Sequence, residues 1–143
     1  MALKITHYYR CNDVADHQAV LSHLHQVLKV FASKGDCTKF YIGITNDLKR
    51  RHAEHQREKQ EYTLMCAIYG EPATHVEDSF HNLERSAVQR FQGGILNPTT
   101  NRRFLCDNTP AVSRGKNWLY LLVDKRDVAD IPMYRPGSVF VGD

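Results

Sequence analysis

Four side chains between positions 41 and 55 have the types and the spacing that binding of a phosphate group requires. Tyr41 and Gly43 alternate onto one face of a predicted strand, where the glycine leaves room for a bulky anion beside the phenol. Arg51 and His55 are four residues apart, so a helix would place them on one face. A guanidinium can contact two phosphate oxygens and stays charged at physiological pH. Strand and helix could therefore present a phenol, a guanidinium and an imidazole to one phosphate.

This segment resembles the second half of the GIY-YIG nuclease signature. That family has a strand ending in Tyr-Ile-Gly, an arginine ten residues after the tyrosine, and often a His or Tyr four residues further on. Tyr41, Arg51 and His55 fill these positions here. Glu84, on a later predicted helix, resembles the glutamate that holds a metal ion in the family, and an Asn-containing loop follows it. The resemblance extends over residues 39–97.

The first half of the signature, Gly-Ile-Tyr, is missing from its usual place about ten residues before the Tyr-Ile-Gly strand. Two explanations remain open. Either the first strand covers residues 28–32 and its tyrosine is absent, or it covers residues 3–10 and a helix is inserted within the hairpin. We favour the second, because the apolar stripe of that helix runs unbroken to a glycine at position 35. Tyr8 would then be the missing phenol, or Tyr9 if the register is shifted by one residue.

The resemblance implies a metal-dependent endonuclease that hydrolyses phosphodiester bonds. Tyr8, or otherwise Tyr41, would accept a proton from the attacking water, and Arg51 would neutralise charge in the transition state. Glu84 would hold one Mg²⁺ or Mn²⁺ ion. Such an ion keeps several water ligands, so one protein carboxylate can be sufficient to bind it. His55 would orient the water or donate to the phosphate. A free phenol has a pKa of about 10, so the site would have to lower it.

The elements that must position these residues follow from hydrophobic periodicity. The pattern predicts an α+β fold with a small mixed sheet of about three central strands flanked by helices. A helical insertion, capped by Asn12 or Asp13, would separate the first two strands, and an extra strand would lie near the C-terminus. Thr45 or Asn46 would cap the helix that carries Arg51. We expect strands at 3–10, 39–45, 62–69 and 118–123, helices at about 12–35, 47–60 and 78–91, a loop over 93–116, and one domain over 1–143 with a C-terminal extension at about 117–143.

Composition limits the class of protein. Hydrophobic residues make up 42% and charged residues 24%, as in soluble globular proteins, which argues against a disordered or fibrous chain. The longest apolar runs are too short to cross a bilayer and no signal peptide is evident, so we expect a cytoplasmic protein that does not enter the membrane. The cysteines are too widely spaced for a zinc site and are expected to be reduced thiols: Cys11, Cys37, Cys66 and Cys106.

Basic charge is concentrated in two segments, although the net charge is only +3. Residues 85–116 hold six basic side chains against one acid, and residues 46–60 also have an excess of basic side chains. Such clusters on one face suit a phosphate backbone. The residues predicted to contact nucleic acid are Gly43, Lys49, Arg50, Arg90, Arg102, Arg103, Arg114 and Lys116.

These patterns predict a nuclease with DNA as its partner, acting as a monomer or a homodimer. The sequence does not separate DNA from RNA as the substrate. Two other functions stay open: a non-catalytic nucleic-acid-binding domain on the same scaffold, and an unrelated α+β interaction domain. In the last, Tyr41 would be an ordinary strand aromatic, Arg51 and His55 a solvated helix face, and Glu84 an exposed carboxylate.

Overall fold

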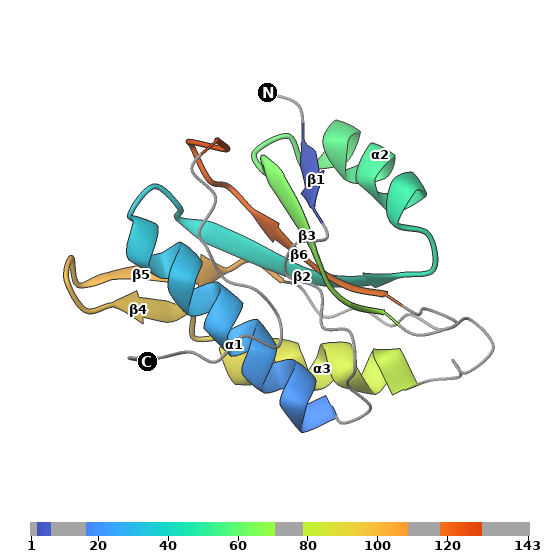
Figure 1. Cartoon of the computed structure of the whole chain (residues 1–143), viewed down its shortest axis with the longest axis horizontal. Helices are drawn as coiled ribbons and strands as arrows, with labels where there is room; N and C mark the ends of the chain where they lie inside the picture. The colour runs from blue at the N-terminus through green and yellow to red at the C-terminus, as the bar shows by residue number, and fades with distance from the viewer. Residues whose placement is uncertain (1–2, 7–16, 71–78, 109–117, 130–143) are drawn as a thin grey trace.

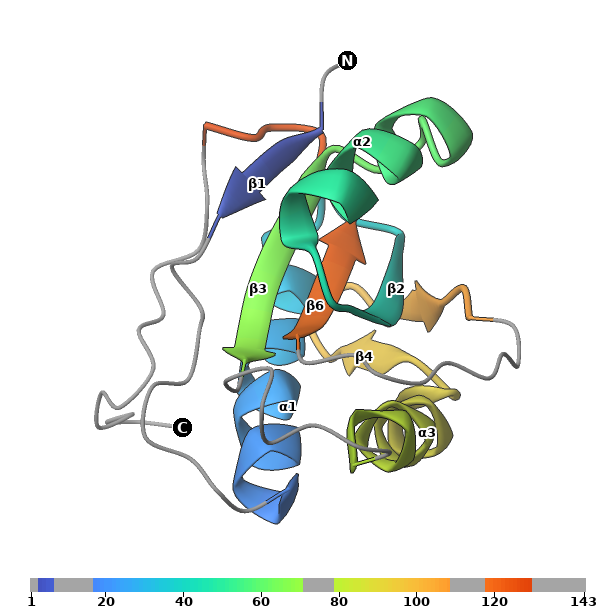
Figure 2. The same cartoon turned by 90° about the vertical axis from the view of Figure 1, so that its right-hand side faces the viewer.

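A computed structural model describes residues 3–6, 17–70, 79–108 and 118–129 of the chain. In these residues three helices pack on a six-stranded mixed sheet with strand order β1-β3-β6-β2-β5-β4. Figures 1 and 2 show α1 and α3 on one face of the sheet and α2 on the other. The elements are β1 (Lys4–Thr6), α1 (His17–Lys34), β2 (Lys39–Thr45), α2 (Leu48–Glu58), β3 (Leu64–Gly70), α3 (Ser79–Phe91), β4 (Ile95–Asn97), β5 (Arg102–Cys106) and β6 (Trp118–Val123).

The α+β class is confirmed, but the predicted arrangement of strands is wrong in two respects. The sheet has six strands in the described residues rather than about three. The strand near the C-terminus is not an addition, because β6 lies in the middle of the sheet and pairs antiparallel with both β2 and β3. Because helices cover both faces of the sheet, the side chains of this central strand are buried on both sides, which accounts for its nearly continuous apolar sequence.

The predicted hairpin between residues 3–10 and the Tyr41 strand does not form. β1 pairs in parallel with β3, and both β3 and β6 separate it from β2. Strand composition is a local property, whereas the choice of a pairing partner depends on the whole sheet, so the sequence pattern could not show this. Tyr8 and Tyr9 lie outside the described residues.

The helix predicted at about 12–35 is observed as α1, and its predicted apolar stripe is buried. Leu24, Leu28 and Phe31 have no exposed surface and pack against the sheet. Gly35 follows the helix at φ 79°, the left-handed conformation that glycine adopts at helix ends. The predicted caps Asn12 and Asp13 lie outside the described residues.

Residues 93–116 were expected to be a loop, but the described part contains the β4–β5 hairpin. Asn97 anchors its turn, since the Asn97 amide donates to the Ala32 carbonyl at 2.8 Å while its own oxygen accepts from the Thr99 N–H at 2.9 Å. The proline, threonine and asparagine residues of this turn are typical of loops, so the sequence pattern did not indicate the two short strands beside it, which tertiary pairing stabilises.

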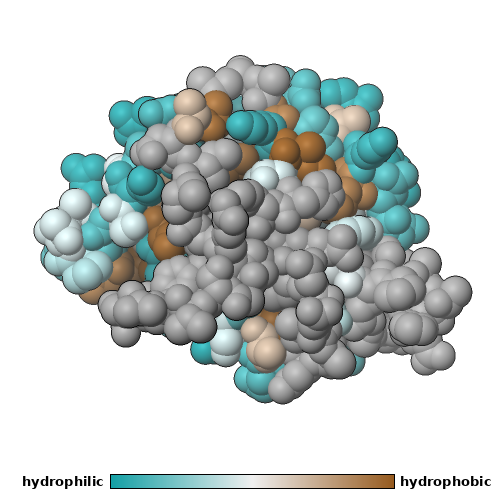
Figure 3. All heavy atoms as spheres, in the orientation of Figure 1, coloured by the Kyte–Doolittle hydropathy of each residue, from teal (hydrophilic) through white to brown (hydrophobic). Residues whose placement is uncertain are grey.

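The two faces of the sheet have separate cores. Phe40, Ile42 and Ile44 face α1 and α3, whereas Tyr41 and Tyr120 lie on the α2 side. In the view of Figure 3, hydrophilic residues gather over the outer surface of α2 at the upper right. No helix in the described part of the chain is long and apolar enough to cross a membrane.

Candidate active site

Strand pairing brings a second tyrosine to the strand that carries Tyr41. β2 and β6 are antiparallel, and Tyr120 stands directly opposite Gly43. A Cβ atom on Gly43 would lie 2.3 Å from the Tyr120 Cζ and Oη atoms, so only glycine fits beneath this ring. The space that we assigned to an anion is therefore filled by a phenol, and Gly43 itself is buried. The prediction that Gly43 contacts nucleic acid is wrong.

Helix α2 aims an arginine and a histidine at the Tyr120 hydroxyl. Its N-cap is Asp47, not Thr45 or Asn46, because the Asp47 carboxylate accepts from the Arg50 N–H. One turn apart on the inner side of the helix, His55 Nε2 lies 2.6 Å and Arg51 Nε 3.3 Å from Tyr120 Oη.

Tyr41 completes this group from the neighbouring strand. Its ring stands edge-on to the His55 imidazole, with 5.7 Å between the centroids, and 6.5 Å from the Tyr120 ring. Arg51 also lies close enough to the Tyr41 hydroxyl to lower its pKa, against the larger effect of burial. We call Tyr41, Arg51, His55 and Tyr120 the phenol cluster. Three of its four members were predicted as site residues, and the structure brings those three together.

The protonation of His55 decides what the Tyr120 hydroxyl can do. Burial, followed by the positive charges of Arg51 and Lys59, lowers the pKa of His55 to about 3, so its imidazole is neutral at physiological pH. His55 has no exposed surface, and its Nδ1 atom has no hydrogen-bond partner among the described residues. Among the same residues Nδ1 is unpaired in either tautomer: with the proton on Nε2 the imidazole donates to the Tyr120 hydroxyl, and with the proton on Nδ1 it accepts from that hydroxyl.

Arg51 donates to the Tyr120 oxygen through Nε–H, and in the tautomer with the proton on Nε2 His55 donates to it as well. The phenol proton must then point away from both, toward the remaining open side of the oxygen. Two donors, one of them charged, stabilise negative charge on that oxygen. Burial acts in the opposite direction and raises the pKa of Tyr120, and the charges of Tyr41 and Glu84 add to this effect.

Glu84 reaches the same region around the edge of β2. The backbone N–H groups of Leu105 and Asp107 donate to the carbonyls of Thr38, just before β2, and of Phe40 within it. The Asn108 side chain then bonds both backbone groups of Ile42. Beyond Ile42, β5 and the described residues after it no longer bond the backbone groups on this edge of β2. The next backbone N–H on this edge belongs to Ile44, and the Glu84 carboxyl lies near enough to it for this N–H to lower its pKa.

The Glu84 carboxylate is poised between its two protonation states. Burial raises its pKa to about 7, although the Arg51 charge and the nearby Ile44 N–H act to lower it. Its negative charge in turn raises the pKa of Tyr41 and Tyr120, which places it within electrostatic range of the phenol cluster. A carboxylate that is not neutralised by its neighbours is the kind of group that a cation would stabilise.

The donor set fits one hard divalent cation held mainly by water. Among the described residues no group of three or more His, Cys, Asp or Glu side chains is placed to hold a metal. One carboxylate suits Mg²⁺, which keeps several waters and takes further ligands from substrate phosphate. Glu84 is the residue that would hold it.

The predicted nucleic-acid contacts do not all share one face. Lys49 and Arg50 are exposed on α2, where Arg50 contacts Asn46 at 2.9 Å and Glu54 at 3.6 Å. On β5 the side chains alternate, so Arg103 shares the face of Tyr41 and Arg102 lies on the face of α1. Arg90 lies near the end of α3, with its guanidinium 5.5 Å from the Phe91 ring centre.

The prediction of a single basic face is therefore wrong for the described arginines. Three of the predicted site residues, Tyr8, Arg114 and Lys116, lie outside the described part of the chain.

The sequence analysis missed Tyr120. A strand was predicted at residues 118–123, and a strand places Trp118, Tyr120 and Leu122 on one face. Nothing local shows that this strand pairs with β2, more than seventy residues earlier in the chain.

Comparison with known protein families, with curated proteins and with solved structures finds no match to this chain. The resemblance to GIY-YIG nucleases therefore depends on the residues themselves and on their arrangement.

Proposed function

We propose that this protein is a metal-dependent endonuclease that hydrolyses phosphodiester bonds in DNA, with Tyr120 in the role first given to Tyr8. The observation that carries the proposal is the pair of nitrogen atoms beside the Tyr120 oxygen, His55 Nε2 at 2.6 Å and Arg51 Nε at 3.3 Å, which both donate to it when the His55 proton is on Nε2. Such donors stabilise a phenolate, which is the form that can accept a proton from water.

Each residue then has a role that follows from its position. Tyr120 accepts the proton of the attacking water, and His55 holds the phenol oxygen from a position without solvent exposure. His55 is therefore a positioning residue that acts through Tyr120, a role that differs from both expected from the sequence, which were orienting the water and donating to the phosphate. Arg51 is partly exposed, with 29% of its side-chain surface accessible, and can also contact the phosphate. Tyr41 is half-buried beside Arg51 and can donate its hydroxyl to a phosphate oxygen.

Glu84 would hold Mg²⁺ or Mn²⁺ at the open edge of β2. When bound, the ion supplies positive charge that stabilises the leaving oxygen and lowers the pKa of nearby acids. The protein alone does not lower the pKa of the two phenols, because burial raises the pKa of both Tyr41 and Tyr120.

The test is cleavage of supercoiled plasmid DNA by the wild-type protein and by Arg51→Gln and Glu84→Gln variants, with Mg²⁺ or with EDTA. We expect cleavage only with Mg²⁺ and only by the wild type, with far-UV circular dichroism unchanged in the variants. Wild-type rates in either variant would contradict the site. Cleavage of an RNA strand but not of DNA would move the proposal to an RNA-directed nuclease.

A non-cleaving nucleic-acid-binding domain is the second candidate. The raised pKa of both phenols favours it, since a phenol that keeps its proton is a hydrogen-bond donor rather than a base. Salt-sensitive DNA binding without cleavage under any metal condition would identify this function.

A further inference from the structure

A pocket of about 90 Å³ lies at the end of the sheet where β2 begins, away from the phenol cluster. Thr38 in its wall precedes Gly43 by five residues, which is about 16 Å along an extended strand. The end of α1, the start of β2, the β4–β5 turn and the segment after β6 all contribute to the wall. The residues that matter here are Gly35, Cys37, Thr38, Thr100, Arg102 and Arg126, and we call this site the arginine pocket.

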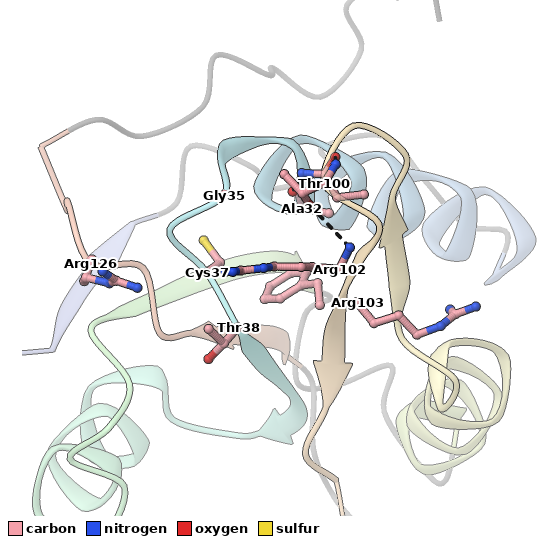
Figure 4. Close-up of a pocket in the computed structure, with 10 residues that line it drawn as sticks. Ala32, Gly35, Cys37, Thr38, Thr100, Arg102, Arg103 and Arg126 are labelled. Carbon is pink, nitrogen blue, oxygen red and sulfur yellow. Dashed lines mark hydrogen bonds between the residues drawn. The ribbon is translucent and has the colours of Figure 1, made fainter.

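Two guanidinium groups border the arginine pocket. Figure 4 shows the Arg102 side chain lying across it toward Cys37, with Arg126 on the far side and Arg103 pointing away. In the described part of the chain, neither Arg102 nor Arg126 has a hydrogen-bond or ion-pair partner for its guanidinium. An arginine without a partner beside a pocket offers its donors to a ligand.

The carboxylates near the pocket are engaged with other groups. Asp36 binds the ammonium of the buried Lys125 at 2.8 and 3.0 Å. Asp124 accepts from the backbone N–H groups of Thr38 and Lys39 at 2.8 and 3.0 Å. Within the described residues, neither carboxylate forms an ion pair with Arg102 or Arg126.

Other polar groups of the wall are compatible with an anion. The Thr100 hydroxyl accepts from the Arg102 N–H at 3.3 Å, which leaves its own proton free to donate. The Ala32 carbonyl oxygen at the end of α1, which carries a partial negative charge, already accepts a hydrogen bond from the Asn97 amide at 2.8 Å. Burial raises the pKa of the Cys37 thiol, and the nearby Asp36 charge adds to this, so the thiol is uncharged.

We propose that the arginine pocket binds a phosphate group, either as inorganic phosphate or at the end of a nucleic-acid strand. Two guanidinium groups around a space of this size suit a tetrahedral oxyanion, and their planar forks can each contact two of its oxygens. This site does not depend on the proposed nuclease activity.

The test is calorimetric titration of the full chain with inorganic phosphate. We expect saturable binding that is about tenfold or more weaker in Arg102→Gln and in Arg126→Gln, since each loses charged hydrogen bonds. Arg57→Ala removes an exposed arginine from α2 and is the charge-matched control, which we expect to bind phosphate as the wild type does. Arg51→Gln reports separately on phosphate binding at the phenol cluster.

Three results would overturn the proposal: no saturable binding, equal binding by wild type and both pocket variants, or loss of binding in Arg51→Gln with retention in Arg102→Gln. Because the two pocket variants alter separate segments, misfolding of one leaves the other as the test, with circular dichroism as the check on folding.

A second titration in EDTA, with short DNA strands that do or do not carry a 5′-phosphate, distinguishes the two sources. Preference for the phosphorylated strand, lost in Arg102→Gln, would support a strand end, and binding of inorganic phosphate alone would support the free ion. Equal binding of both strands by wild type and Arg102→Gln, with no phosphate binding, would contradict the pocket.

Discussion

Substitution of Gly43 by alanine tests the closest packing contact in the candidate site. The added Cβ would lie 2.3 Å from two atoms of the Tyr120 ring, so the ring has to move. Overpacking of this kind costs about 1–3 kcal/mol, and displacement of the hydroxyl from the buried His55 adds about 1 kcal/mol. We therefore expect Gly43→Ala to lower the free energy of unfolding by about 2–4 kcal/mol.

Urea unfolding followed by the fluorescence of Trp118, the single tryptophan, measures this cost. Gly93→Ala is the matched control, because no atom lies within 4 Å of its added Cβ and its φ is not positive. We expect its effect to stay within about 0.5 kcal/mol.

A double-mutant cycle separates the clash with the ring from any general effect on the strand. In a Tyr120→Ala background the ring is gone, so Gly43→Ala should cost nothing or should stabilise the strand slightly. Wild-type stability of Gly43→Ala, or an undiminished cost in the Tyr120→Ala background, would refute the packing that we describe.

Two further predictions concern titration and metal binding. Because the pKa of His55 is lowered to about 3 while the unfolded chain has an ordinary value of about 6.5, folding stability should fall as the pH drops below about 6.5. His55→Gln, which keeps a donor but does not titrate, should show a smaller loss of unfolding free energy between about pH 7 and pH 4.5; equal losses would contradict the buried neutral imidazole. Because the pKa of Glu84 is raised to about 7, its ionisation opposes folding as the pH rises, and a bound cation should relieve this. Mg²⁺ should therefore raise the melting temperature of the wild type more at pH 8 than at pH 6, with no such rise in Glu84→Gln; an equal rise in the variant would place the metal elsewhere.

Local patterns were sufficient to predict the elements that carry most of the site. The alternation in β2 and the apolar stripe of α1 are properties of short segments, and both elements lie where the sequence predicted. The spacing of Arg51 and His55 likewise fixed their common helix face, which the contacts of both with Tyr120 confirm.

Local sequence patterns could not predict which strands pair with each other. The composition of residues 3–10 suited a strand, but the partner of β1 is β3 rather than β2. Tyr120 therefore received no role, although its strand was predicted, because its neighbours Gly43 and His55 are distant in the sequence. The basic residues after Glu84 were assigned to one face for a related reason, since the β5 strand that separates Arg102 from Arg103 is stabilised by tertiary contacts.

The central claim is that the Tyr120 oxygen takes the proton of the attacking water. Tyr120→Phe removes this one atom and keeps the ring over Gly43, so the packing of the two strands is preserved. The decisive measurement is the single-turnover rate of plasmid nicking in Mg²⁺ for wild type, Tyr120→Phe and Tyr8→Phe. Loss of a general base costs about 10²–10⁴-fold in rate, and we predict a loss of that size in Tyr120→Phe with little change in Tyr8→Phe. Nicking that survives in Tyr120→Phe and is lost in Tyr8→Phe would contradict this assignment.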